Sequence, residues 1–354
     1  MMKSNDIEST STELTISSSE PVQEQHVDYL FMEETRKTVL PIIYPSLWAN
    51  YKKQAGCFWQ RHEVDLSRDK VQWDALDEQE RYFLEMVLGF FASGDLLVNK
   101  NLSDRFLNEI QKHEVQIGYS YQRMMENIHS EMYAALIDSY ITDLDNRDKL
   151  FNAIQRIPVI KKISNWVNAV IESSKSYDER LIAFAAFEGI MFSGPFCAIF
   201  WIREKGILQG LTKSNDFISR DEGLHVEFAV EIHKLLKIKA SNKSATDIIS
   251  EAVNLSIEFI VTALPCSLIG INAANMVKYI KYVANRLMTQ LGYDPIYANA
   301  TQPFEFMERI GLVNKSNFFE NKPTEYSRAE VEEKKESTAY DELLDAFNSS
   351  DTDN

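Results

Sequence analysis

The stretch IAFAAFEGIMFSGPFCAIFW, residues 182–201, decides the fold of this chain. It is apolar almost throughout, yet it holds one ionisable side chain, Glu188. A lone carboxylate in a low-dielectric interior is costly, and it either takes up a proton or finds a compensating partner. The remainder of the sequence must therefore supply groups that compensate Glu188.

Composition favours helices. Apolar residues make up 45% of the 354 residues, while glycine and proline number only 12 and 9, and turn signals are too sparse for a β protein. Long helical patterns alternate with short polar connections, and Asp77 followed by Glu80 is typical of a helix start. Pro195 should distort its helix one to two turns beyond Glu188. We expect an all-α fold with helices over residues 77–102, 104–140, 148–172, 178–205, 214–238, 245–262 and 268–291.

The formal net charge of −16 lies mainly at the two ends of the chain. Residues 1–28 carry −5 and residues 325–354 carry −7, which leaves −4 for the rest. We expect a disordered acidic tail over residues 1–28, one helical domain over 29–322 and a flexible tail over 323–354. No basic patch indicates nucleic-acid binding.

The three cysteines are scattered and form no CxxC pair, which favours a reducing, cytoplasmic location. The N-terminus has neither the apolar core of a secretory signal nor the basic character of a transit peptide. Residues 181–202 are long enough to cross a bilayer, so membrane insertion is a rival interpretation. We expect no membrane span, because acids inside membranes are rare and no comparable second span is evident.

Two of the six histidines follow a glutamate by three residues. Glu126 and His129 lie in MMENIHSEMY, and Glu222 and His225 lie in SRDEGLHVEF. Residues three apart share a helical face, so each pair points a carboxylate and an imidazole toward one place. Two such helices, with one carboxylate from each of two others, form the dimetal site of di-iron and di-manganese bundles.

The two further carboxylates are Glu188 and Asp95, the latter in LGFFASGDLLVNKNL. Asp95 precedes Glu126 by 31 residues and Glu188 precedes Glu222 by 34, enough for two antiparallel helices and a turn. Four carboxylates would balance two divalent cations. A single Glu-x-x-His pair more often lies on a solvated face, but the doubled arrangement favours a dimetal site that compensates Glu188.

At these residues the sequence resembles the small, radical-generating subunit of class I ribonucleotide reductase, in its eukaryotic and viral branch. The resemblance covers residues 40–320. It implies a ferritin-like helical bundle with additional helices and a homodimer. It also implies two iron ions per chain, joined by an oxo bridge, although the ligand types suit manganese equally. The matching strings are GCFWQRHEVDLSRDK, FFASGDLLVNKNL, MENIHSEMY, FAAFEGIMFSGPF, SNDFISRDEGLH and NFFE.

The resemblance assigns Asp95 and His129 to one metal and Glu188 and His225 to the other. Glu126 and Glu222 then bridge the two metals. The reduced metals activate dioxygen, and Tyr133 carries the resulting radical. Tyr133 follows His129 by four residues and so lies on the same helical face. The apolar pocket around the radical is matched by Phe192, Phe196 and Ile218.

The family passes the radical to a large catalytic subunit by proton-coupled electron transfer, for the reduction of ribonucleotides to deoxyribonucleotides. By resemblance, the route runs from Tyr133 and His129 through Asp221 and Trp59 to a tail tyrosine. Tyr326 is the first choice for that tyrosine and Tyr340 the second. A diphosphate reductase is expected, but the sequence leaves a triphosphate substrate open.

The C-terminal tail resembles the segment with which the family docks on its large subunit, with anchors at residues 344–347. Here the chain departs from the related pattern, because NSSDTDN follows Phe347 and removes a terminal carboxylate there. A second departure is the string SGD, in which Gly94 precedes Asp95, whereas relatives often carry the glycine after the aspartate. Three alternatives remain: a dimetal oxidase, desaturase or monooxygenase that acts directly on an organic substrate, a metal-free paralogue that stabilises a catalytic small subunit, and an iron store.

Overall fold

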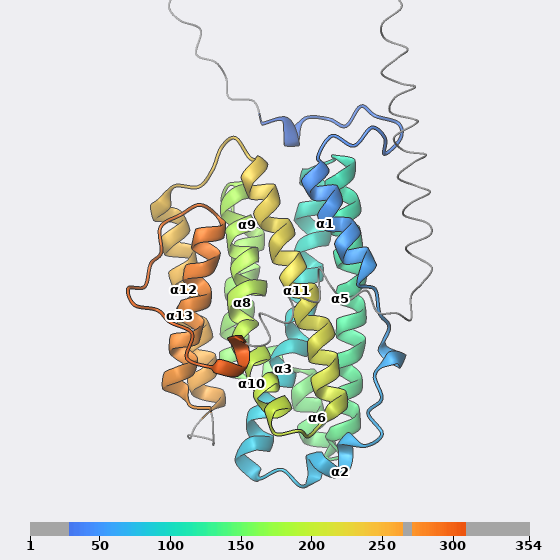
Figure 1. Ribbon diagram of the computed structural model, residues 1–354, viewed down its shortest axis with the longest axis vertical. Coiled ribbons are helices and arrows are strands. Elements are labelled where there is room, and N and C mark those ends of the chain that lie inside the picture. Colours follow the sequence, from blue (N-terminus) through green and yellow to red (C-terminus); the bar gives the residue numbers. More distant parts are fainter. Residues whose placement is uncertain (1–27, 265–270, 309–354) are drawn as a thin grey trace, which may run out of the picture.

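Four long helical segments run side by side through the body of the chain (Figure 1). The computed structural model describes residues 28–264 and 271–308, which form helices and no β-strand. The predicted all-α bundle is therefore confirmed. The four segments are α3 (Glu78–Asn101), α5 (His113–Tyr140), the continuous run of α9 (Tyr177–Ala186), η4 (Phe187–Met191) and α10 (Ser193–Glu204), and α11 (Gln209–Leu235).

Further helices surround these four. On one side, α1 (Pro45–Gly56) packs against α5 and α11, and α2 (Asp69–Asp74) contacts the same pair. On the other side, α8 (Pro158–Glu172) and α12 (Asn242–Ala263) pack against α9, and α13 (Ala273–Gln290) packs against η4 and α10. The shorter elements are η1 (Tyr29–Phe31), η2 (Arg61–Glu63), η3 (Leu102–Phe106), α4 (Leu107–Glu109), α6 (Leu144–Phe151) and α7 (Ala153–Arg156).

Some helix boundaries differ from the prediction. The Asp77 carboxylate accepts hydrogen bonds from the amides of Gln79 and Glu80, at 2.9 and 2.8 Å, and starts α3 as expected. The helix predicted over residues 148–172 is wrong, because it is divided into α6, α7 and α8, with Pro158 opening α8 at a position that needs no amide donor. Both α1 and α2 were missed.

The single helix predicted over residues 104–140 is also wrong. Ile110 takes an extended conformation after α4, and α5 starts only at His113. The Gln116 amide of α5 donates to the carbonyls of Leu107 and Ile110, at 2.6 Å each. A side chain from the next helix thus satisfies the carbonyls at this break, a tertiary contact that no helical periodicity reveals.

The expected distortion of the central helix occurs, but its predicted position was wrong. It lies at η4, a π-helical segment that contains Glu188, and not one to two turns beyond it. Pro195 falls in the first turn of α10, before the Phe196 amide donates to the carbonyl of Phe192 at 2.9 Å. Pro195 has no amide hydrogen to donate. This interrupts no α-helical hydrogen bond, because the wider π-helical turn lies before Pro195, at η4.

Two helical runs are long and apolar enough to cross a membrane, Tyr177–Glu204 and Glu78–Glu109. The expectation that no second comparable span exists was therefore wrong. Inside the fold, 94% of the most apolar window of the first run and 72% of that of the second are buried. Burial among neighbouring helices accounts for the apolar character of both runs, which form the core of the bundle.

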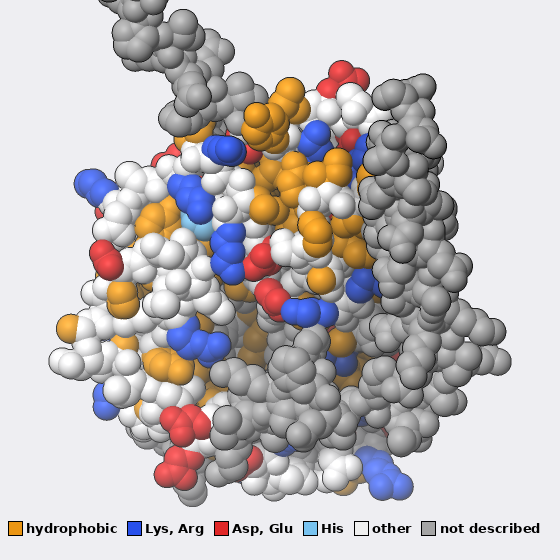
Figure 2. Space-filling model, turned by 45° about the horizontal axis from the view of Figure 1, so that its top comes forward, with side chains coloured by type: hydrophobic (Ala, Val, Ile, Leu, Met, Phe, Trp, Pro, Cys, Tyr) orange, Lys and Arg blue, Asp and Glu red, His pale blue; other side chains and the backbone are white. Residues whose placement is uncertain are grey.

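The segment before α1 is tied across one end of the bundle by a buried ion pair. The Arg36 guanidinium donates to both oxygens of Glu114 on α5, at 3.0 and 2.7 Å, and the Ile43 amide donates to Glu114 at 2.7 Å. Apolar side chains gather at this end among lysines and arginines (Figure 2). The segment itself exposes Tyr29, Phe31, Met32, Leu40 and Ile43.

The tails predicted over residues 1–28 and 323–354 lie outside the described residues, except for Asp28. Tyr326, Tyr340 and the docking anchors at residues 344–347 belong to the second of these tails.

Candidate metal centre

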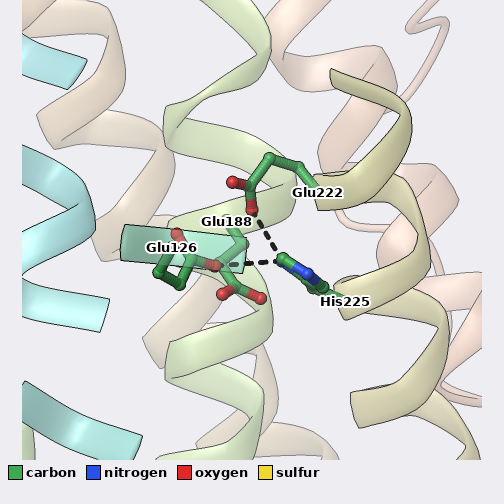
Figure 3. Close-up of side chains that lie close together, drawn as sticks. All are labelled: Glu126, Glu188, Glu222 and His225. Atoms are coloured by element: carbon green, nitrogen blue, oxygen red, sulfur yellow. Dashed lines mark hydrogen bonds and ion pairs between the residues drawn. The ribbon is translucent and has the colours of Figure 1, made fainter. Parts of the chain in front are cut away.

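The four core segments bring six predicted ligands to two adjoining places. Figure 3 shows four of them, Glu126, Glu188, Glu222 and His225. Asp95 comes from α3, the Glu126 and His129 pair from α5, Glu188 from η4, and the Glu222 and His225 pair from α11. Potential ligand atoms lie within 4.8 Å of one another in each of two groups. The first group is Asp95, Glu126 and His129, and the second is Glu126, Glu188, Glu222 and His225.

The two glutamates of the Glu-x-x-His pairs lie between the two imidazoles. His129 Nδ1 is 3.1 Å from Glu222 Oε1 and 3.4 Å from Glu126 Oε2. His225 Nδ1 is 3.0 Å from Glu126 Oε1 and 3.3 Å from Glu222 Oε2. Each glutamate therefore faces both histidines, the geometry required of carboxylates that connect two metal positions.

The whole cluster is inside the protein, where charge needs compensation. All six residues are at most 2% exposed. Both oxygens of Asp95 and Oε2 of Glu188 have no hydrogen-bond partner among the described residues. Unpaired carboxylate oxygens in an apolar core are a strong reason to expect cations, and two divalent ions would match the four carboxylates. The residues present thus fit a dimetal-carboxylate centre.

The pKa values of the predicted ligands in the metal-free chain also favour cation binding. Burial, reinforced by the charge of Glu126, raises the pKa of Asp95 well above its ordinary value. Burial and the charge of Glu222 likewise raise the pKa of Glu188 well above its ordinary value. Burial opposes protonation of His129, yet hydrogen bonds to Asp221 and Glu126 prevail and raise its pKa well above its ordinary value. Without metal, protons therefore compete with cations for these side chains.

Tyr133 lies at the edge of this cluster. Its side chain is 1% exposed, and its phenolic oxygen has no hydrogen-bond partner among the described residues. Burial, followed by the charge of Asp95, raises the pKa of Tyr133 well above its ordinary value. The phenol is thus held neutral in a dry environment next to the carboxylates.

The apolar surroundings of Tyr133 include a ring that the sequence analysis did not select. Phe91 stacks on Tyr133, with ring centroids 4.8 Å apart and planes 4° from parallel. The predicted Phe192 and Phe196 contact Phe91, at centroid distances of 5.5 and 4.8 Å. Ile218 is buried as well. The signal that could have identified Phe91 is its position four residues before Asp95, which places it on the same face of the helix.

The predicted relay residues form a connected chain. Trp59 Nε1 donates to Asp221 Oδ2 at 2.7 Å, and His129 Nε2 lies 3.1 Å from the same oxygen. Trp59 and His129 also stack, with ring centroids 6.0 Å apart. One carboxylate oxygen therefore joins the indole to an imidazole of the metal centre.

Arg220 completes the environment of Asp221 and was missed from the sequence. Its Nε and Nη2 donate to Asp221 Oδ1 at 3.2 and 3.0 Å, and Nη2 also donates to the carbonyl of Cys57 at 2.6 Å. Burial acts to raise the pKa of Asp221, but the His129 hydrogen bond and the charge of Arg220 outweigh it, and the pKa is lowered. Asp221 is therefore kept ionised between its donors. Arg220 is adjacent to Asp221 in the sequence, which is the one signal that could have drawn attention to it.

The sequence of this chain is similar to the sequences of one family of known proteins. The family described as ribonucleotide reductase, small chain, matches residues 36–303. The chain is 47% identical to the ribonucleoside-diphosphate reductase small chain of Nicotiana tabacum, covering 84% of this chain and 90% of the relative. It is 48% identical to the small chain of Variola virus, covering 84% of this chain and 92% of the relative.

Solved structures of the same family have a similar fold. The Rnr4 homodimer of ribonucleotide reductase from Saccharomyces cerevisiae is 35% identical, with a TM-score of 0.72, covering 79% of this chain and 89% of that one. The R2 subunit from Clostridium botulinum, 22% identical with a TM-score of 0.70, shows the same fold over 77% of this chain and 88% of that one. The buried carboxylates and imidazoles on four core segments are the arrangement expected of this fold. The chain thus belongs to the ribonucleotide reductase small-chain family, as its motifs predicted.

Proposed function

We propose that this chain is the radical-generating small subunit of a ribonucleoside-diphosphate reductase. The observation that carries the proposal is a buried tyrosine, without a hydrogen-bond partner in the described part of the chain, beside two groups of potential ligands that share Glu126. Asp95 and His129 would hold one metal, Glu188 and His225 would hold the other, and Glu126 and Glu222 would be shared between them. The 47 to 48% identity to named ribonucleoside-diphosphate reductase small chains supports a diphosphate substrate.

The chemistry at Tyr133 requires loss of one electron and one proton from the phenol. When bound, the metal pair supplies the activation of dioxygen and the oxidant that removes the electron. Among the carboxylates, the charge of Asp95 acts most strongly on the phenol, followed by those of Glu222 and Glu126, so the proposed path of the proton leads toward the ligand cluster. The rings of Phe91, Phe192 and Phe196 exclude water and reductants from the resulting radical.

Transfer out of the core uses the chain of contacts from His129 to Trp59. When Trp59 loses an electron, its indole proton passes to Asp221 Oδ2, 2.7 Å from Nε1. Arg220 holds the other carboxylate oxygen, so Asp221 keeps the orientation in which both His129 and Trp59 reach Oδ2. From Trp59 the proposed route continues to Tyr326, with Tyr340 as the alternative, and on to the large catalytic subunit.

Iron is the proposed metal, with two ions per chain, and the oxygen and imidazole ligands of the centre suit it. A homodimer is proposed as well, and the Rnr4 homodimer supports it. Leu96 on α3 and Met124 on α5 are 58% and 38% exposed, and Asn99 of α3 donates to Asn127 of α5 at 3.2 Å. Such a semi-apolar helical face suits contact with a second copy.

Two further proposals concern the whole chain. The cytoplasm is the proposed location, which the unpaired Cys57 and Cys197 support. The proposed organisation remains an acidic tail over residues 1–28, a helical domain over 29–322 and a docking tail over 323–354.

Aerobic reconstitution of the metal-free chain with Fe²⁺ tests this proposal. We expect two iron ions per chain by elemental analysis and an organic radical in the electron paramagnetic resonance spectrum. With a large subunit of the family, the loaded chain should convert a ribonucleoside diphosphate to the deoxy product. Uptake of fewer than two ions, or full loading without any radical, would contradict the proposed function.

Removal of residues 341–354 tests the docking tail. The truncated chain should keep its metals and its radical, because all six ligands and Tyr133 lie in the described core. Activity with the large subunit should fall at subsaturating concentrations and recover partly when that subunit is in excess. The measurement is activity as a function of large-subunit concentration, and an unchanged titration would show that these residues have no docking role.

A further inference from the structure

Gln122 is a buried side chain that makes direct contact with one of the proposed ligands. It lies on α5 one turn before Glu126, and therefore on the same helical face. Its Nε2 donates to Glu188 Oε1 at 2.7 Å across the gap between α5 and η4. Gln122 is fully buried and Glu188 is 2% exposed, so water does not compete for this hydrogen bond.

This hydrogen bond distinguishes Glu188 from Asp95, the other carboxylate assigned to a single metal position. Both oxygens of Asp95 are without a partner among the described residues. Glu188, in contrast, has Oε1 engaged by Gln122, and of its two oxygens only Oε2 is without a partner in the described part of the chain. Gln122 therefore fixes the orientation of the Glu188 carboxylate, whereas no described residue donates to Asp95 in this way.

The chemical type of the donor matters. An arginine or lysine at this place would neutralise one of the four carboxylates and leave an excess of positive charge once two divalent ions were bound. An apolar side chain would leave Glu188 Oε1 without a donor in a buried site. The neutral amide avoids both, because it orients the carboxylate and leaves its charge available. The Gln122 Oε1 atom has no partner among the described residues, so Glu188 is the contact that the structure provides for this amide.

We infer that Gln122 is a positioning residue for Glu188 and sets the metal affinity of the position formed by Glu188, Glu222 and His225. The inference rests on the proposed function, since it takes Glu188 to be a ligand. Gln122 acts through the carboxylate and touches neither metal nor substrate. It should affect one metal position and leave that of Asp95 and His129 nearly unchanged.

Anaerobic titration of the full metal-free chain with Mn²⁺ tests this inference. The signal of free Mn²⁺ in electron paramagnetic resonance reports bound ions without any need for catalytic activity. Gln122→Leu, of similar size but without a donor, should weaken one of the two binding steps by about 10-fold to 100-fold, the range typical of groups that orient a metal ligand. The other step should stay within about twofold of the wild type, well below that range.

Gln116→Leu is the matched control, because Gln116 lies on the same helix and donates to the backbone carbonyls of Leu107 and Ile110 instead. It should bind two Mn²⁺ ions as the wild type does. Two unchanged steps in Gln122→Leu would overturn the inference, and so would equal weakening of both steps. Gln122→Met removes the same donor with a more adaptable side chain and replaces Gln122→Leu if that variant does not fold.

A double variant shows whether Gln122 acts through Glu188. In a Glu188→Gln background, Gln122→Leu should cause little further loss of Mn²⁺ affinity, because the oriented carboxylate is already gone. Additive losses would overturn the inference. A wild-type chain that fails to bind two ions would refute the proposed function itself, whereas full loading of both the wild type and Gln122→Leu refutes only the role of Gln122.

Discussion

Tyr133→Phe should abolish the organic radical while two metal ions per chain remain bound. The substitution removes only the phenolic oxygen, which has no hydrogen-bond partner among the described residues, so no buried group loses its partner. The ring should keep its stacking on Phe91. A phenylalanine has no hydroxyl to give up a proton as the electron leaves. Metal analysis and electron paramagnetic resonance after aerobic reconstitution measure the two results separately.

Trp59→Phe provides the contrast, because Trp59 lies beyond the metal centre on the proposed route. This variant should form the radical but lose activity with the large subunit by about 10²-fold or more, the scale typical of losing a proton-transfer group. A radical of unchanged spectral shape in Tyr133→Phe would reject Tyr133 as its site. Full activity of Trp59→Phe would reject the contact with Asp221 as part of the route.

Glu188→Ala should reduce metal loading from two ions to about one per chain. Its carboxylate is the one that η4 contributes to the second group of ligands, and alanine supplies no oxygen in its place. Glu126, Glu222 and His225 remain, but this position then lacks the carboxylate that a dimetal bundle takes from each of its other two helices. Elemental analysis after anaerobic loading and desalting gives the stoichiometry directly.

Glu114→Ala is a suitable control for that experiment. Glu114 is also a fully buried acid, but it pairs with Arg36 at one end of α5, at 2.7 Å. Its loss should lower thermal stability, because Arg36 is left without its buried partner, and should leave two metals bound. Unchanged loading in Glu188→Ala would contradict its role as a ligand. Equal loss of metal in Glu188→Ala and Glu114→Ala would show that general destabilisation, and not the loss of a ligand, lowers metal loading.

Much of the centre was predictable because its information is local. A spacing of three residues places Glu126 with His129, and Glu222 with His225, on one face of any helix. Glu188 and Asp95 stood out because each is an acid in apolar sequence, and the cost of burying an unpaired charge holds in every fold. The structure brings all six residues together. The Trp59 and Asp221 contact also agrees with the prediction, but that one came from the family resemblance and not from spacing.

Other features of the fold and the centre could not be predicted without the tertiary structure. The break before His113, the π-helical turn around Glu188 and the Gln122 hydrogen bond depend on how one helix sits against another. The sequence by itself determined the all-α class and the set of acids and histidines that must be buried together, because periodicity and residue chemistry act over a few residues. Only the tertiary structure decided where helices break and which neutral side chains orient the carboxylates. Those outcomes follow from contacts between residues tens of positions apart, and helical periodicity carries no information about the axial register of one helix along another.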